Sequence, residues 1–233
     1  MLDSDVTDFC LDGPRLLLLE NSGTRVIAWD TGFAAAETIP VSSRVYPARG
    51  IYADRYYIYV YDERTLYRIP KDNYLLSPWL NNVRVAGIAG YAPAEVLVSD
   101  EERQRVWLKT MFGESRVFLD RADVNRPGAL TAFPGGVYGV ISEHRRLLKV
   151  NRAGIVLRSI PLPQPVDMLA ADEQGRAFLM RRGVNFIYLI TENGSFFYIL
   201  NGVVNPVALR CLAGRIFILD NGRRIVIFPV PGR

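Results

Sequence analysis

Apolar stretches and turn residues alternate along this chain in a unit that recurs. The clearest copy, residues 206–228 (PVALRCLAGRIFILDNGRRIVIF), has a proline, an apolar stretch, a Gly turn, a second apolar stretch, an Asp-Asn-Gly turn and a third apolar stretch. Short apolar runs between Gly, Asn and Asp turns predict β-strands rather than helices. This copy therefore predicts three strands joined by tight turns.

Two independent sets of positions give the period of the repeat. The residues that open the third strand of each unit lie 38 to 41 residues apart: Arg25, Thr65, Arg105, Arg146, Asn185 and Arg223. The polar residues that close the preceding strand follow nearly the same steps: Glu20, Asp62, Asp100, Glu143, Arg182 and Asp220. A period of about forty residues indicates a repeat architecture built from one supersecondary unit.

The repeat predicts a single all-β domain. Its units cover approximately residues 5–45, 46–82, 83–125, 126–164, 165–205 and 206–233. Four strands are predicted in each of the first five units and three in the last. Such units cannot bury their own faces, and radial stacking of four to eight of them produces a β-propeller. We predict a six-bladed β-propeller of four-stranded antiparallel blades, in preference to a seven-bladed or open form.

The sixth blade is predicted to be incomplete. In a propeller of this kind, residues before the first inner strand would normally supply the missing outer strand. Only Met1–Ser4 precede that strand here, which is too short for a good closing strand. Three alternatives follow: the blade has three strands, residues missing from this chain close it, or a partner supplies the strand.

The unit resembles the NHL repeat of six-bladed propellers. The matching stretches are DNGRRIVIF at 220–228, ENSGTRVIAW at 20–29 and DEERQRVWL at 100–108, together with the blade openings PARGIYAD at 47–54, PGALTAF at 127–133 and PVDMLAAD at 165–172. The fifth unit departs from the pattern, with Arg182 and Asn185 at the acidic and arginine positions, and Thr65 replaces the arginine of the second. The resemblance covers nearly the whole chain and implies the fold more than any activity.

Composition is compatible with one sizeable core. The chain has 233 residues, of which 49% are hydrophobic, and no run of eighteen apolar residues that would predict a membrane span. Its first residues, MLDSDVTDF, lack a basic segment followed by an apolar one. The expected location is the periplasm or cell envelope if a signal segment has been removed, and the cytoplasm otherwise.

Arginines gather in the turns between second and third strands, all of which lie on one face of a propeller. As candidate binding residues on this turn face we take Arg64, Arg103, His144, Arg145, Arg146, Arg181, Arg182 and Arg224. One interpretation is a basic rim for RNA, an acidic protein or an anionic glycan. The favoured interpretation is acid–arginine pairing within each blade, because the net charge is only +4.

Small residues on the inner strands, such as Gly50 and Gly87, are expected to let the backbones crowd around a central channel. A cluster of tyrosines could form a stacking platform, but we favour core packing between blades with hydroxyls at the rim. Its members are Tyr52, Tyr56, Tyr57, Tyr59, Tyr61 and Tyr67.

Catalytic patterns are scarce. His144 is the only histidine, so neither a zinc site with several histidines nor a histidine-based triad can be built. A calcium-dependent hydrolase or lactonase would need oxygen ligands that converge on the channel, for which Asp8, Asp54 and Asp167 are the candidates. We predict no enzyme activity, no cofactor and no metal.

Cys10 and Cys211 both fall on predicted inner strands, in the first and sixth blades. A disulfide between them would join the two ends of the ring and imply an oxidising compartment. Buried free thiols are the favoured alternative, because adjacent inner strands can be too far apart for a disulfide.

The sequence therefore predicts a non-catalytic, protein-binding or scaffolding propeller within a larger assembly. Its partner would dock on the turn face or at the open sixth blade. RNA or anionic-ligand binding through the turn face is the first alternative, and a metal-dependent hydrolase is the second.

Overall fold

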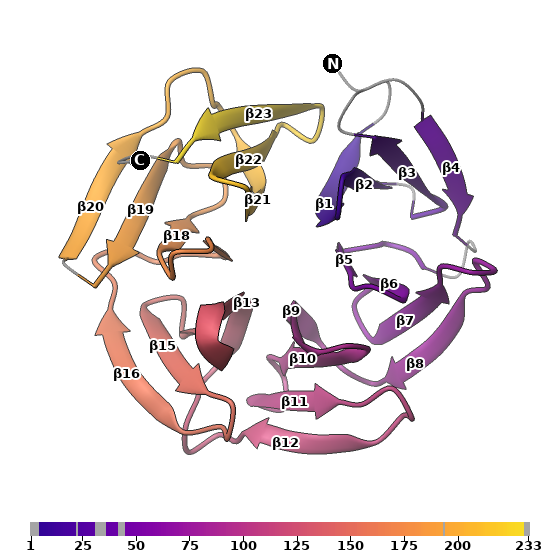
Figure 1. Ribbon diagram of the computed structural model, residues 1–233, viewed down its shortest axis with the longest axis horizontal. Coiled ribbons are helices and arrows are strands. Elements are labelled where there is room, and N and C mark those ends of the chain that lie inside the picture. The colour runs from indigo at the N-terminus through magenta and orange to yellow at the C-terminus, as the bar shows by residue number, and fades with distance from the viewer. Residues whose placement is uncertain (1–4, 22, 31–35, 42–44, 193, 231–233) are drawn as a thin grey trace.

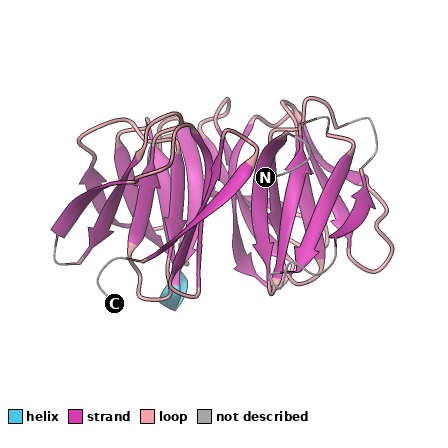
Figure 2. Cartoon of the chain, turned by 90° about the horizontal axis from the view of Figure 1, so that it is seen from above, coloured by secondary structure: helices cyan, strands magenta, loops and turns pink. Residues whose placement is uncertain are grey.

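The predicted propeller is confirmed. The computed structural model describes residues 5–21, 23–30, 36–41, 45–192 and 194–230, so the predicted lack of a closing strand in Met1–Ser4 lies outside the described residues. Six antiparallel sheets stand around a central axis (Figure 1). Seen edge-on, the strands run between two layers of turns (Figure 2). The described part contains no helix long and apolar enough to cross a membrane.

Each blade is a simple meander whose first strand lies at the channel and whose last lies outermost. The first two blades comprise β1 (Val6–Asp12), β2 (Arg15–Glu20), β3 (Arg25–Asp30), β4 (Ala36–Pro40), β5 (Gly50–Ala53), β6 (Tyr57–Tyr61), β7 (Thr65–Pro70) and β8 (Ser77–Asn81). The third and fourth comprise β9 (Val85–Ala92), β10 (Glu95–Asp100), β11 (Arg105–Lys109), β12 (Ser115–Leu119), β13 (Pro127–Phe133), β14 (Val137–Ser142), β15 (Arg146–Asn151) and β16 (Val156–Pro161), with one 3-10 turn, Pro134–Gly136.

The fifth and sixth blades differ in strand number. The fifth comprises β17 (Met168–Ala171), β18 (Ala177–Met180), β19 (Phe186–Thr191) and β20 (Gly194–Ile199). The sixth comprises β21 (Pro206–Leu212), β22 (Arg215–Asp220) and β23 (Arg224–Pro229). Among the described residues the sixth blade thus has three strands, as predicted. Just before its third strand, the Arg223 amide belongs to the turn and donates to the Asp220 carbonyl (3.1 Å).

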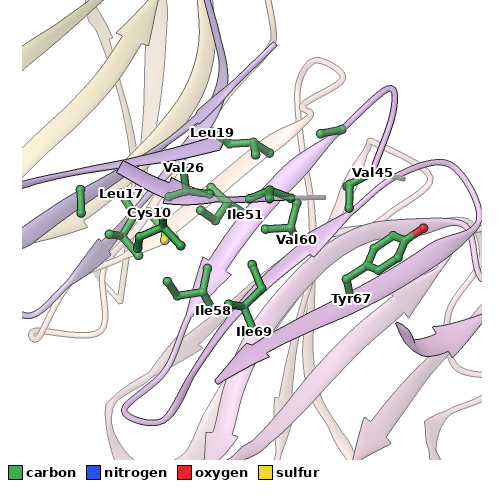
Figure 3. Packing of buried hydrophobic residues seen from close by; sticks show 14 residues of the cluster. Cys10, Leu17, Leu19, Val26, Val45, Ile51, Ile58, Val60, Tyr67 and Ile69 are labelled. Carbon is green, nitrogen blue, oxygen red and sulfur yellow. The ribbon is translucent and has the colours of Figure 1, made fainter. Parts of the chain in front are cut away.

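The core lies between blades, because second strands are apolar on both faces. Leu17 and Leu19 of β2 pack toward the second blade, whereas Leu16 and Leu18 pack toward the sixth. Figure 3 shows the first of these clusters, in which Leu17 and Leu19 face Ile51. A fully buried Leu or Ile contributes about 1.5–3 kcal/mol relative to an exposed one. The continuous apolar run RLLLLE is therefore what a strand sandwiched between two blades requires.

The ring closes through its innermost strands. The Val6 amide donates to the Gly222 carbonyl (2.7 Å), and Arg223 pairs with Asp5 (2.6 Å). Farther in, the Arg210 guanidinium of β21 donates to both carboxylate oxygens of Asp8 on β1 (2.9 and 3.0 Å). The first and last blades are thus joined at the channel and at the turn face, and among the described residues they share no outer strand.

Candidate functional site

A cavity of about 250 Å³ lies on the propeller axis, and all six inner strands contribute to its lining. Much of the wall is aliphatic or alanine. Its charged and phenolic side chains are Asp8, Arg49, Tyr52, Tyr61, Asp167, Arg182 and Arg210. Arg49, Asp167 and Arg182 come from the ends of strands that meet the turn face, so charge is concentrated at that end of the channel.

Two glycines leave space for tyrosine hydroxyls at the channel wall. Tyr61 of β6 lies opposite Gly50 of β5, and a Cβ on Gly50 would lie only 2.1 Å from the Tyr61 hydroxyl oxygen. A Cβ on Gly90 would likewise lie 2.6 Å from the hydroxyl oxygen of Tyr52. Any larger residue at either glycine would displace the phenol. A side chain of a second strand thereby reaches past the inner strand into the cavity.

Asp8 accepts more hydrogen bonds than Asp167, the other carboxylate that lines the channel. It accepts hydrogen bonds from the amides of Phe9 (2.9 Å) and Ile51 (3.0 Å) as well as from Arg210. These donors come from the first, second and sixth blades. Asp8 therefore serves as a structural bridge, which leaves it poorly suited to the metal-ligand role considered from the sequence.

Asp167 is also engaged, at the turn-face end of the cavity. Its carboxylate lies 3.1 Å from His144 Nδ1 and accepts a hydrogen bond from the Arg182 amide (3.2 Å). His144 additionally contacts the Val166 carbonyl (3.2 Å). The only histidine is thus an exposed turn residue that orients a channel carboxylate.

Asp54 does not join the other two candidate carboxylates. It accepts hydrogen bonds from the Tyr56 and Tyr57 amides (2.7 and 2.8 Å) and from the Tyr59 hydroxyl (2.9 Å). It is therefore a turn residue outside the channel lining. Within the described ranges, no three His, Cys, Asp or Glu side chains are grouped so that they could hold a metal ion.

The eight candidate residues of the turn face divide into two sets. Four have side-chain partners: Arg103 with Asp100 (3.1 Å), His144 with Asp167, Arg146 with Ser159 (3.1 Å) and Arg224 with Asp220 (2.6 Å). The other four are exposed, and no described group pairs with their guanidinium groups: Arg64, Arg145, Arg181 and Arg182. Of all eight, only Arg182 lines the channel. Binding by this set remains a prediction.

No disulfide joins Cys10 and Cys211, which lie at different interfaces between blades. Cys10 packs in the cluster between the first and second blades, and Cys211 packs against the cluster between the fifth and sixth. Burial holds the pKa of Cys10 well above its ordinary value.

The tyrosine-rich blade combines core and channel roles. Tyr59 is fully buried beside Trp79, with ring centroids 5.2 Å apart, and the Tyr67 hydroxyl donates to Asp62 (3.2 Å). Core packing with bonded hydroxyls therefore describes these two residues. The sequence pattern did not predict that Tyr52 and Tyr61 line the channel. The sequence signal for Tyr61 is Gly50, which lies opposite it on the neighbouring strand β5.

Comparison with known proteins identifies the fold alone. No protein-family profile and no curated protein matches the chain. Solved structures that match include streptogramin B lyase (TM-score 0.74, 12% identity, 100% of this chain and 85% of that one). Virginiamycin B lyase from Staphylococcus aureus matches with TM-score 0.71 at 10% identity, over 99% and 86% of the two chains. A nidogen–laminin complex matches with TM-score 0.76 at 14% identity, over 93% and 89%.

These matches correct one prediction and leave another unresolved. The prediction that excluded enzyme activity is wrong as an exclusion, because two lyases have this propeller fold. Catalytic groups on a propeller can come from several separate blades, so a missing sequence motif does not exclude catalysis. The NHL assignment itself is not confirmed, and what holds is the six-bladed propeller.

Proposed function

We propose that this chain is a protein-binding propeller whose sixth blade accepts an extended strand from a partner protein. The observation that carries the proposal is the exposure of β23. Every other third strand has at least two buried residues, whereas β23 has none. In the part of the chain that the structure describes, β23 pairs with β22 on one edge and with no strand on the other.

The other blades indicate what the incoming strand should carry. In the first four blades, the second residue of the third strand lies opposite an aliphatic residue of the fourth: Val26 with Ile39, Leu66 with Leu80, Val106 with Leu119 and Leu147 with Ile160. All four third-strand residues are fully buried. The equivalent residue of β23 is Ile225, opposite Leu219 of β22, and it is only half-buried.

The core at the seam between the first and sixth blades is also only partly covered. Its cluster has as many half-buried hydrophobic members as buried ones, among them Ile27, Trp29 and Ile225. Farther along β23, Ile227 is 41% exposed. An added antiparallel strand would cover this apolar surface and pair with the open backbone edge of β23, which is how β-strand addition supplies affinity and side-chain specificity.

The proposed partner segment is therefore an extended strand that runs antiparallel to β23 and places an aliphatic residue opposite Ile225. Support at the level of the fold comes from the nidogen–laminin complex, whose matching propeller was solved together with a partner. The exposed arginines of the turn face favour no competing proposal, since half of the eight candidates have partners within the protein.

The test uses a peptide copy of a fourth strand from this chain, residues 154–163 (GIVLRSIPLP). At millimolar concentration it should slow amide hydrogen exchange in β23 more than in β16 or β20. The same peptide with Ile160→Asp should have no effect. An Ile227→Lys protein should lose the protection, and the matched variant Leu157→Lys, on the outer strand of a complete blade, should keep it.

Equal protection of all outer strands, or none in β23, would contradict the proposal. In a second test, natural partners recovered with the wild-type chain are compared with those recovered with Ile227→Lys. Only a partner that is lost in the variant counts as bound at the β23 edge.

A further inference from the structure

The charged groups at the turn-face end of the channel are paired, with one exception. Arg49 pairs with Glu63, Arg210 with Asp8, and Asp167 with His144. Arg182 alone among these cations has no hydrogen bond or ion pair to its guanidinium from any described residue, although its amide is held by Asp167. The channel thus presents one guanidinium whose donors have no partner among the described residues.

Tyr61 supplies a second unused donor in the same cavity. No described residue forms a hydrogen bond with its hydroxyl, which Gly50 admits to the channel wall. Burial and Asp8 raise the pKa of Tyr61, while Arg210, Arg182 and Arg49 oppose the rise. The phenol therefore remains protonated at physiological pH and lies within electrostatic range of Arg182.

The carboxylates nearby do not cancel this arrangement. Asp8 accepts from two amides and a guanidinium, and Asp167 accepts from an amide beside His144. The oxygens of both carboxylates therefore accept hydrogen bonds from groups of the protein itself. At the turn-face end of the cavity, the donors left for a ligand are thus Arg182 and Tyr61, and a guanidinium and a hydroxyl are donor types that bind an oxyanion.

Part of the remaining cavity wall is apolar. Ile51, Leu130 and Leu169 contribute to its wall, along with several alanines. An apolar cavity of roughly 150 Å³ holds benzene. The cavity of about 250 Å³ therefore accommodates a ring-sized body together with an acid group.

We propose that the channel binds a small organic anion, with its carboxylate or phosphate held by the Arg182 guanidinium and the Tyr61 hydroxyl and its apolar body in the channel. This site shares no residue with the open edge of β23. Either proposal can therefore fail without the other.

Calorimetric titration of the full chain with four ring-sized probes tests the ligand class. Benzoate and phenyl phosphate should bind, and the stronger of the two identifies the preferred acid group. Benzamide, which is neutral, and benzylamine, which is cationic, should bind at least about tenfold more weakly, because a charge-assisted hydrogen bond is lost. Equal binding of benzamide would overturn the proposal, as would no binding of either anion at about 10 mM, an affinity weaker than one good charged contact provides.

Three variants test the residues. Arg182→Gln should weaken anion binding by about tenfold or more, and Tyr61→Phe by about threefold to tenfold. Arg181→Gln is the matched control, since this neighbouring arginine is exposed but does not line the cavity. An equal loss in Arg181→Gln would mean diffuse attraction to the turn face and would overturn the assignment. Circular dichroism of each variant establishes that the loss is not due to unfolding.

Discussion

The acidic residues that close second strands organise the turns of this propeller. Asp220 is fully buried and accepts hydrogen bonds from the amides of Val204 (3.0 Å) and Asn205 (2.6 Å) and from Arg224. Burial opposes its ionisation, but these donors outweigh burial and hold the pKa of Asp220 below its ordinary value. The repeated Asp…Arg pattern therefore encodes turn geometry between blades, which is a structural role.

Asp220→Ala should lower the free energy of unfolding by about 2–3 kcal/mol at neutral pH, because it leaves buried donors without an acceptor. A depressed pKa in the folded state stabilises the protein above the unfolded pKa of about 3.9, and this contribution is lost as pH falls through the folded value. The difference between wild type and variant should thus be constant at pH 5–8 and shrink below about pH 4, as measured by urea unfolding.

The control is Asp123→Ala, whose side chain is exposed. A comparable loss in the control, or a difference that grows as pH falls, would contradict this account of Asp220.

At the scale of strands, periodicity predicted the fold but not the channel. Alternating apolar runs and turn residues place β2, β6 and β10 correctly, because local propensity and burial agree there. Tyr61 reads as another core residue of YYIYVY, and only its cross-strand neighbour Gly50 reveals that it enters the channel. Arg210 was not predicted either, since its partner Asp8 is 202 residues away and becomes adjacent only when the ring closes.

Strand β23 should behave as an outer strand despite its third position. Its amides should exchange with solvent at least about tenfold faster than those of β11, because it is covered on one edge and has no buried residue. Hydrogen exchange with mass spectrometry measures this difference directly. Exchange in β23 as slow as in β11 would mean that the edge is already covered.

At the scale of the whole molecule, the seam relies on few contacts, and Asp8 is central to them. Asp8→Ala removes the acceptor shared by three blades and leaves the Arg210 guanidinium without its carboxylate. We expect the free energy of unfolding to fall by about 3 kcal/mol. Exchange should quicken in β1, β5 and β21, which meet at Asp8, while β13 across the ring is unaffected.

Asp5→Ala is the matched variant at the same seam. It removes only the exposed pair with Arg223 and should cost less than about 1 kcal/mol. If both variants cost the same, the buried bridge at Asp8 would have no special role in closing the ring.

The open edge of β23 also has a consequence for the protein when its partner is scarce. An unpaired strand edge beside apolar side chains is a template for any extended segment, including an outer strand detached from another molecule of the same chain. Such exchange is head-to-tail, so it would build closed rings where the rotation between molecules closes and linear polymers where it does not. A propeller whose β23 edge stays uncovered would therefore be prone to self-assembly at high concentration.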